Sequence, residues 1–501
     1  MERLQELRRQ RLLKLQEVKD LNVNPYPYSY TVTNYVQDLV QKHASLLPGQ
    51  ENRDVEVSLA GRLSALREHG KSKFGNLQDS SGKIQIYLRQ DIVGEENFNF
   101  FKKLDIGDIL GVKGGVFRTH TGELTILVRE FKLLTKSLRP LPEKWHGLTD
   151  VEQRYRQRYL DLICNPAVRK VFEQRIKIIK SIREFLDHKG FLEVETPMMH
   201  SIPGGATARP FVTYHNTLDC KLYLRIAPEL YLKRLLVGGF DKVYELNRNF
   251  RNEGISIQHN PEFTMLEIYQ AYVNYEAMME LVEEIFFHLG KEIIGTTQID
   301  YQGVLIDLTP PWPRLTMVEA LQKYGGINVE QTSDEELGEL TIKYEIPLPG
   351  NPSRGEMINV LFDKLITSKL IQPVFIKDYP VETSPLAKRK PNSPQWAERF
   401  ESFIYGREMG NAFSELNDPV DQRERFKNQI SELGKEGVGI DEDFLRALEY
   451  GMPPAAGLGL GIDRLVMLLT NAASIREVIF FPQLRDKSVE LEEKEEIITD
   501  Q

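Results

Sequence analysis

Residues 245–272, ELNRNFRNEGISIQHNPEFTMLEIYQAY, contain the pattern on which the fold depends. Two strand-like runs flank a turn rich in Asn, Gly and His, which predicts an antiparallel hairpin. Because alternate residues of a strand share a face, Phe263, Glu267 and Tyr269 point the same way. The hairpin places Arg251 near Glu267. That pair suits either a structural ion pair or a binding site, and the spacing alone favours neither.

A second hairpin is predicted for residues 400–418, FESFIYGREMGNAFSELND. Alternation places Asn411 and Glu415 on one face, while Glu401 and Glu408 lie on either side of a turn near Gly406. Carboxylates that point inward require cations, and Mg²⁺ prefers such hard oxygen ligands beside phosphate. Two glutamates exposed on a surface hairpin remain the alternative.

Residues 457–469, GLGLGIDRLVMLL, run from spaced glycines into an apolar helix. The spacing is G-x-G-x-G without a following lysine, so it matches neither the dinucleotide fingerprint nor a P-loop. The glycines indicate a close approach to the backbone. Arg464 falls in the first helical turn, where the positive end of the helix dipole disfavours a cation unless an anionic or aromatic group faces it.

Residues 53–136 contain five short β-rich runs separated by Gly, Asp and Ser turns. This pattern predicts a five-stranded OB-fold barrel, a fold that binds oligonucleotides. A basic patch and one aromatic residue, Phe74, support that function, because single-stranded bases stack on aromatic rings inside basic grooves. The patch between Gly61 and Gly75 contains Arg62, Arg67, Lys71 and Lys73 against Glu68 alone.

The whole chain has 501 residues and a formal charge of −9, so its bulk charge argues mildly against a nucleic-acid partner. Its length predicts about three domains. The two cysteines, Cys164 and Cys220, form no disulfide framework or zinc motif. We expect a cytoplasmic protein, because the sequence has neither a signal-peptide pattern nor an apolar run long enough to cross a membrane.

Three segments together carry a resemblance to a known family. HKGFLEVETP (188–197), FRNEG with HNPEFTMLE (250–267) and GLGLGIDR (457–464) resemble motifs 1, 2 and 3 of class II aminoacyl-tRNA synthetases. A barrel ahead of the catalytic domain is typical of the aspartyl, asparaginyl and lysyl subgroup. GGATARPFVTYHN (204–216), RIAPELYLKR (225–234), ETSPLAK (382–388) and GREMGNAFSELND (406–418) resemble lysyl-tRNA synthetases.

The resemblance implies an α+β fold, with an N-terminal five-stranded OB-fold β-barrel followed by a class II catalytic domain built on an antiparallel β-sheet flanked by helices. The domains expected are as follows: an N-terminal helix and lead-in (1–52), an OB-fold anticodon-binding domain (53–137), a linker (138–165), a catalytic domain (166–487) with a helical insertion at about 314–371, and an acidic tail (488–501).

The resemblance also implies the role of each site residue. The catalytic residues are Arg251 and Arg464, and Glu401 and Glu408 hold Mg²⁺, the expected cofactor. The ATP site comprises Arg251, Glu253, His259, Phe263, Glu401, Glu408 and Arg464, with adenine between Phe263 and Arg464. The lysine site comprises Gly205, Glu229, Arg251, Glu267, Tyr269, Asn411 and Glu415, with the ε-ammonium held by Glu415 and Tyr269. The anticodon site comprises Arg62, Arg67, Phe74, Gln85 and Glu123.

The reaction implied is activation of L-lysine with ATP, followed by transfer of lysine to the terminal adenosine of tRNA(Lys), by a homodimer joined through motif 1. Three alternatives stay open. The first is a relative that attaches lysine to a translation factor, which the barrel disfavours. The second is an aspartyl or asparaginyl enzyme, which the acidic pocket disfavours. The third is an inactive RNA-binding regulator, which has no need of a complete ATP site.

Overall fold

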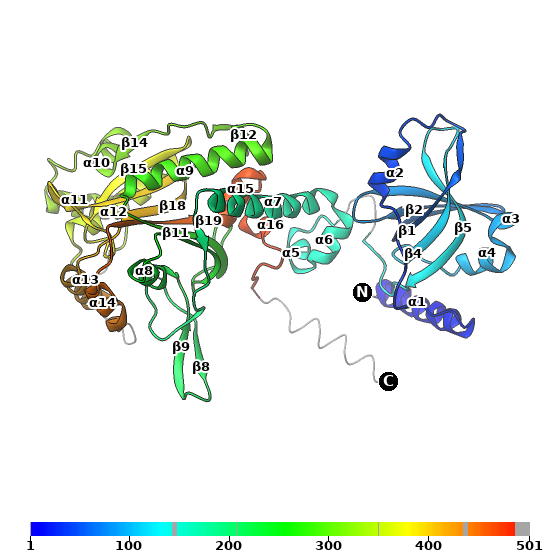
Figure 1. Ribbon diagram of the computed structural model, residues 1–501, viewed down its shortest axis with the longest axis horizontal. Coiled ribbons are helices and arrows are strands. Elements are labelled where there is room, and N and C mark those ends of the chain that lie inside the picture. Colours follow the sequence, from blue (N-terminus) through cyan, green and yellow to red (C-terminus); the bar gives the residue numbers. More distant parts are fainter. Residues whose placement is uncertain (1, 143–147, 207, 349, 434–438, 486–501) are drawn as a thin grey trace. The chain divides into compact units, whose positions relative to one another are not determined.

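The computed structural model describes residues 2–142, 148–206, 208–348, 350–433 and 439–485. The chain divides into two compact units, Met1–Thr149 and Asp150–Gln501. Each unit has its own core and is described by itself (Figure 1). The acidic tail expected at 488–501 lies outside the described residues. No helix within the described ranges is long and apolar enough to cross a membrane.

The first unit is built around a closed five-stranded barrel with the strand order β1-β2-β3-β5-β4. Its strands are β1 (Glu51–His69), β2 (Ser72–Gln78), β3 (Lys83–Arg89), β4 (Ile109–Arg118) and β5 (Leu124–Thr135). In β2 and β3 buried residues alternate with partly exposed ones, as a barrel wall requires. The predicted OB-fold barrel is therefore confirmed.

Four helices accompany the barrel: α1 (Glu2–Asp20), α2 (Val36–Lys42), α3 (Gln90–Val93) and α4 (Glu95–Phe101). Helix α1 contacts the barrel domain through Arg11, which donates hydrogen bonds to carbonyl groups of Ile106 and Arg139 at 2.8 and 3.0 Å. Lys14 adds an ion pair with Asp105 at 2.6 Å. Specific polar contacts thus hold this helix, whose exposed face includes Leu12 and Leu13.

The second unit contains a nine-stranded, mainly antiparallel sheet. The main path is β14-β15-β17-β18-β19-β11-β10-β6, and β16 pairs with β17. The bounds are β6 (Leu192–Glu193), β10 (Lys242–Phe250), β11 (Glu262–Ala271), β14 (Arg314–Thr316), β15 (Val374–Pro380), β16 (Arg389–Lys390), β17 (Ser393–Ile404), β18 (Arg407–Ser414) and β19 (Ala455–Gly461). The predicted antiparallel catalytic sheet is confirmed.

Three helices pack apolar side chains on this sheet: α7 (Pro166–His188), α9 (Tyr275–Leu289) and α15 (Ile462–Leu469) (Figure 1). Their buried residues and those of the strands form one core. Helix α8 (Glu229–Val237) belongs to a separate cluster with α14 (Glu442–Glu449), and this cluster includes Tyr269 of β11. The site described below lies where α8 meets the central strands.

The segment expected as a helical insertion begins with β14, which pairs in parallel with β15 of the main sheet. After it come α10 (Met317–Ala320), η2 (Leu321–Gly325), α11 (Asp334–Lys343), α12 (Arg354–Leu365) and η3 (Thr367–Lys369). Residues of α10, η2, α11 and α12 share a hydrophobic cluster with residues of β15 and β17. Capping boxes at Thr316, Ser333 and Ser353 begin the three α-helices.

Part of the segment expected as a linker is helical. Helices α5 (Val151–Arg156) and α6 (Arg158–Cys164) belong to the second unit. Arg158 is buried, pairs with Asp161 at 2.6 Å and donates to the carbonyl of Phe480 at 3.1 Å. The polar sequence of this segment did not predict that it packs against the second unit. Its charged residues are tolerated when buried because they pair with one another.

The remaining elements are η1 (Gly290–Ile294), α13 (Pro419–Leu433), α16 (Ile475–Val478), the pair β12 (Gln298–Tyr301) and β13 (Val304–Asp307), and the three-stranded sheet of β7 (Met199–His200), β8 (Val212–His215) and β9 (Cys220–Leu224).

Candidate functional site

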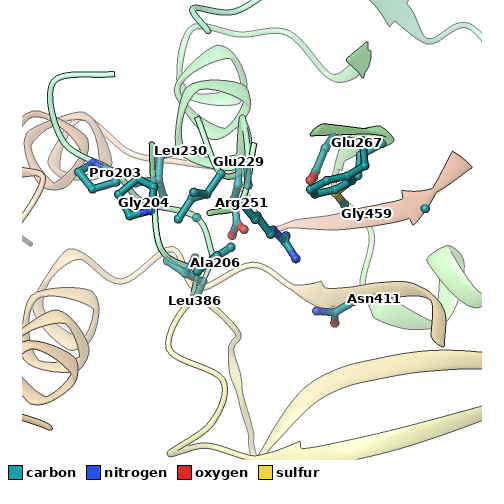
Figure 2. Close-up of a pocket in the computed structure, with 18 of the residues that line it drawn as sticks. Pro203, Gly204, Ala206, Glu229, Leu230, Arg251, Glu267, Leu386, Asn411 and Gly459 are labelled. Atoms are coloured by element: carbon teal, nitrogen blue, oxygen red, sulfur yellow. The ribbon is translucent and has the colours of Figure 1, made fainter. Parts of the chain in front are cut away.

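A cavity of about 1430 Å³ opens over the central strands of the second unit (Figure 2). Eleven of the thirteen residues predicted for the ATP and lysine sites line it, although they come from five separate stretches of sequence. These are Gly205, Glu229, Arg251, Glu253, His259, Phe263, Glu267, Tyr269, Glu408, Asn411 and Arg464. The other two, Glu401 and Glu415, lie in strand β17 and directly after β18, and neither lines the cavity.

Arg251 follows the last residue of β10 and points into the cavity between Glu229 and Asn411 (Figure 2). Arg251 and Glu253 were expected on one face of a short strand; this prediction was wrong, because β10 ends at Phe250 and both residues follow it. The guanidinium lies over the Phe263 ring at 5.1 Å, and burial lowers the pKa of Arg251. Within the described chain its Nε has no hydrogen-bond partner. A buried cation with a free donor is suited to an anionic ligand.

Arg464 lines the same cavity as Phe263, and the expected binding of adenine between these two residues stays a prediction. Arg464 donates to the backbone carbonyl of Glu408 at 2.6 Å and pairs with its carboxylate at 3.3 Å. It also lies 3.3 Å from Nε2 of His259. The anionic partner expected in front of this helix is thus Glu408. Glu253 and His259 are exposed in the loop between β10 and β11.

A β-bulge brings Glu408 to the cavity. The β17–β18 register runs Glu401↔Asn411 and Ser402↔Gly410, then shifts to Phe403↔Glu408. Strict alternation would put Glu408 and Asn411 on opposite faces, because they are three residues apart. The extra residue of the bulge restores a shared face, so both line the cavity. Sequence alternation alone does not predict this arrangement.

Glu408 lies close enough to Glu401 to affect its ionisation. Burial and then the charge of Glu408 raise the pKa of Glu401 to about 7. The Glu401 carboxylate is held by Tyr379 at 2.9 Å and by Arg399 at 2.6 Å. Such mutual repulsion between hard oxygen ligands fits a divalent cation. No cluster of three or more metal-ligating side chains occurs in the described residues, so an ion here requires water or phosphate as additional ligands.

Carboxylates dominate the other end of the cavity. Glu267 is buried, and Tyr269 donates a hydrogen bond to it at 3.2 Å. Burial and then the charge of Glu229 raise the pKa of Glu267 to about 8. Glu229 begins α8 and lies beside Gly205, where a φ of +87° and contacts with Glu229 and Ala227 disfavour any side chain. This end of the cavity is therefore shaped for a cation.

Glu415 lies behind the cavity wall, against Gly457 of β19. It is buried and forms an ion pair with Lys233, which also pairs with Glu229 at 2.7 Å. Burial and then Glu229 raise the pKa of Glu415 to about 8, although Lys233 opposes the rise. Among the described residues, Oε1 of Glu415 has no hydrogen-bond partner.

Two site residues escaped the sequence prediction. Lys233 follows Glu229 by four residues on a helix, a spacing that brings the two side chains together and could have revealed the pair. Arg399 lines the cavity, donates to Asn411 at 3.1 Å and pairs with Glu401. It precedes Glu401 by two residues on β17, so strand alternation could have identified it.

The barrel presents a second candidate site. Phe74 of β2 stacks on Tyr87 of β3 with ring centroids 4.4 Å apart and an interplanar angle of 18°. Both rings are partly exposed. Gln85 donates to Glu123 at 2.8 Å and accepts from Thr125 at 2.9 Å. Tyr87 was missed, although it lies on the same face as Gln85, two residues away.

The basic patch predicted beside Phe74 is smaller than its sequence indicates. Lys73 points inward, forms an ion pair with Glu68 and lies over the rings of Phe98 and Phe101 at 5.5 and 5.9 Å. This prediction of the patch was wrong for Lys73, because neighbouring strand residues face opposite sides. Arg62 donates to the carbonyl of Gly107 at 2.8 Å, whereas Arg67 is exposed opposite Phe74.

Comparison with known proteins finds a matching family for each unit. Residues 150–485 match the family model for class II tRNA synthetases (D, K and N), and residues 57–134 match the model for the OB-fold nucleic acid binding domain. A protein of Moorella thermoacetica named "Lysine--tRNA ligase" is 56% identical over 95% of this chain and 97% of its own. One of Carboxydothermus hydrogenoformans with the same name is 55% identical over 97% and 99%.

A third relative with that name, from Halalkalibacterium halodurans, is 53% identical over 95% of this chain and 96% of its own. These matches span both the barrel and the sheet, so the likeness is not confined to one unit. The chain therefore belongs to the class II tRNA synthetases of the D, K and N group and, within them, to the lysine–tRNA ligase family.

Proposed function

We propose that this protein joins L-lysine to tRNA(Lys). It activates lysine with ATP to give lysyl-adenylate and pyrophosphate, and then transfers lysine to the 3′-hydroxyl of the terminal adenosine. The observation that carries the proposal is the polarity of the cavity. One cavity is lined by the cations Arg251 and Arg464 and by the acidic residues Glu408, Glu229 and Glu267, with Tyr269 beside Glu267.

Activation requires little proton chemistry from the protein. The lysine carboxylate is already a nucleophile and attacks the α-phosphate in line, so the catalytic task is to position the reactants and neutralise charge. Arg251 is the candidate for this task, because its buried guanidinium has a free donor that faces the cavity. Phe263, beneath Arg251, offers a flat apolar surface for adenine, with Arg464 as the second partner.

Glu401 and Glu408 are the residues that would hold Mg²⁺. When bound with ATP, the ion supplies positive charge to the phosphate groups. Glu253 and His259 in the loop after β10 are placed to contact the nucleotide. Support for the acidic pair comes from the raised pKa of Glu401, which a nearby cation would reverse.

The lysine substrate is assigned to the acidic part of the cavity. Gly205 and Glu229 would receive the α-ammonium, and Asn411 would lie near the carboxylate. Glu415 and Tyr269 would hold the ε-ammonium together with Glu267. Buried carboxylate oxygens without a partner are costly, so the site rejects an uncharged side chain far more strongly than a hydrocarbon pocket would.

The barrel is proposed to bind the tRNA anticodon. Phe74 and Tyr87 form an aromatic surface for stacking, and Gln85 with Glu123 offers donors and acceptors to base edges. Arg67 is exposed beside this surface, and Arg62 lies on the same strand. The negative charge elsewhere on the chain repels the tRNA phosphates only over short distances, because salt screens it over about 10 Å at ordinary ionic strength.

A homodimer and a cytoplasmic location complete the proposal. Several apolar side chains in or beside motif 1 are more than 45% exposed, namely Leu192, Met198 and Met199. Exposed apolar groups of this kind are typical of subunit interfaces. The chain has only two cysteines, and Cys220 is a free thiol, which suits a reducing compartment. Sedimentation that showed an active monomer at micromolar concentration would refute the dimer.

One assay series tests the function. Amino-acid-dependent ATP–pyrophosphate exchange is measured with each common amino acid, followed by aminoacylation of total tRNA. Lysine alone should support exchange, and tRNA(Lys) should be charged. Exchange without charging would favour a translation factor as acceptor, exchange with aspartate or asparagine would contradict the lysine assignment, and no exchange would indicate an RNA-binding regulator.

A further inference from the structure

Helix α8 places an internal cation at the acidic end of the cavity. Lys233 Nζ lies 2.7 Å from Glu229 and also pairs with Glu415. The side chains of Lys233 and Glu415 are completely buried, and that of Glu229 is 8% exposed. The aromatic rings of Phe413 and Phe444 face the ammonium at 5.4 and 5.9 Å. Lys233 itself is not among the residues that line the cavity.

The charges around Lys233 do not balance. From β11, Glu267 and the phenol of Tyr269 face the same carboxylates, and Arg399 of β17 acts on Glu229 from a greater distance. Lys233 pairs with Glu229 and Glu415, whereas the third carboxylate, Glu267, is acted on by the charge of Arg251. When all three carboxylates are ionised, they exceed the one buried ammonium among them by two negative charges, and Arg251 and Arg399 act on them from outside this group. L-Lysine carries two ammonium groups, and its carboxylate has a separate partner in Arg251.

We infer that Lys233 is a positioning residue for the lysine substrate, which holds the carboxylates of Glu229 and Glu415 in place and makes their ionised forms tolerable in the empty pocket. The inference rests on the proposed lysine site. Lys233 carries a single positive charge against two paired carboxylates, so it does not neutralise them, and the group keeps negative charge for the ammonium groups of a substrate. The pocket therefore prefers a doubly charged amino acid over one with a single ammonium group.

The ionisation of the group supports this geometry. Burial lowers the pKa of Lys233, but the charges and hydrogen bonds of Glu229 and Glu415 have a larger effect in the opposite direction, so the pKa of Lys233 is raised. In return Lys233 opposes the rise in the pKa of Glu229 that burial causes. Removal of this cation would leave buried carboxylates without compensation, and they would keep their protons to higher pH.

The test compares Lys233→Met with the wild type in lysine-dependent exchange from about pH 6.5 to about pH 9.5. Loss of about one pKa unit of stabilisation should raise the KM for lysine about tenfold near neutral pH. The difference should shrink as the pH rises and the carboxylates ionise. The KM for ATP should stay within about twofold of the wild type, because the nucleotide lies at the other end of the cavity.

Lys242→Met is the matched control. Lys242 is also partly buried, faces the Phe191 ring at 5.4 Å and donates to the carbonyl of Lys189 at 3.2 Å, but it does not line the cavity. It should leave the KM for lysine and its pH profile unchanged. If Lys233→Met loses ATP binding and thermal stability, Lys233→Gln, whose side chain keeps a polar end, is measured in the same assay instead.

Two outcomes separate the inference from the proposed function. No lysine-dependent exchange by the wild type would refute the function itself. A second outcome is that the wild type exchanges normally, but the Lys233 variants raise the KM for lysine equally at every pH, or raise the KM for lysine and for ATP equally. That result would overturn the positioning role and leave Lys233 a structural role.

Discussion

Substitution of Gly457 by alanine tests the geometry of the lysine end most directly. Gly457 lies on β19, and a methyl group there would overlap the carboxylate of Glu415 and the ring of Tyr269. Neither neighbour can withdraw easily, because Tyr269 is 2% exposed and Glu415 is 1% exposed. The variant should therefore displace two proposed contacts of the ε-ammonium.

The expected magnitude follows from the cost of overpacking. An extra methyl in a closely packed site costs about 1–3 kcal/mol, which corresponds to a rise of about 5- to 150-fold in the KM for lysine. The KM for ATP should stay within about twofold. ATP–pyrophosphate exchange at varied lysine and varied ATP gives both constants from one reaction.

Gly461→Ala is the control on the same strand. Its added methyl would meet other atoms no closer than 3.7 Å, an ordinary contact distance, although Gly461 also lines the cavity. The control should retain wild-type constants for both substrates. The reasoning fails if Gly457→Ala behaves like Gly461→Ala, or if it weakens ATP as much as lysine.

Three other results are expected. Glu415→Gln should raise the KM for lysine far more than that for ATP, since it removes one buried charge, and equal weakening of both in the exchange assay would contradict the ε-ammonium role. Phe74→Ala should raise the KM for tRNA about tenfold, because a stacked base contributes about 1–3 kcal/mol, and should leave exchange unchanged; Tyr28→Ala, at a fully exposed ring, is the control, and lost exchange in the Phe74 variant would indicate misfolding. For the wild type, kcat/KM for lysine should increase as the pH rises through about 8, where Glu267 and Glu415 lose their protons and become able to bind ammonium groups; a profile that is flat from about pH 6.5 to about 8.5 would exclude this titration.

Much of the architecture is encoded locally. Alternating apolar residues and turn-forming residues predict the barrel strands, and the hairpin after Leu246 follows from the same rule. Motif spacing then predicts which residues meet, and eleven of them do line one cavity. Such predictions succeed because strand alternation and short turns depend on neighbours in sequence.

Long-range packing accounts for what the sequence concealed. The bulge opposite Ser402 changes the face on which Glu408 lies, and nothing in the local pattern signals it. The orientation of Lys73 depends on α4, which supplies Phe98 and Phe101. The sequence around the buried pair Arg158–Asp161 resembles a polar linker. Its packing is not predictable locally, because Arg158 donates hydrogen bonds to the carbonyl groups of Arg476 and Phe480, which are more than 300 residues away.

The distribution of charge matters more than its total of −9. In the catalytic unit, acidic residues lie where the proposed ligands carry positive charge: Glu401 and Glu408 beside a metal site, and Glu229, Glu267 and Glu415 around two ammonium groups. Each cluster also contains cations of the protein: Arg399 and Arg464 pair with Glu401 and Glu408 in the first, and Lys233 pairs with Glu229 and Glu415 in the second. In the second cluster the single buried cation limits repulsion between the carboxylates without neutralising them. The negative charge that remains can bind a cationic ligand. Because the cations of the protein compensate the carboxylates only in part, the same charges affect both the stability of the fold and the choice of substrate.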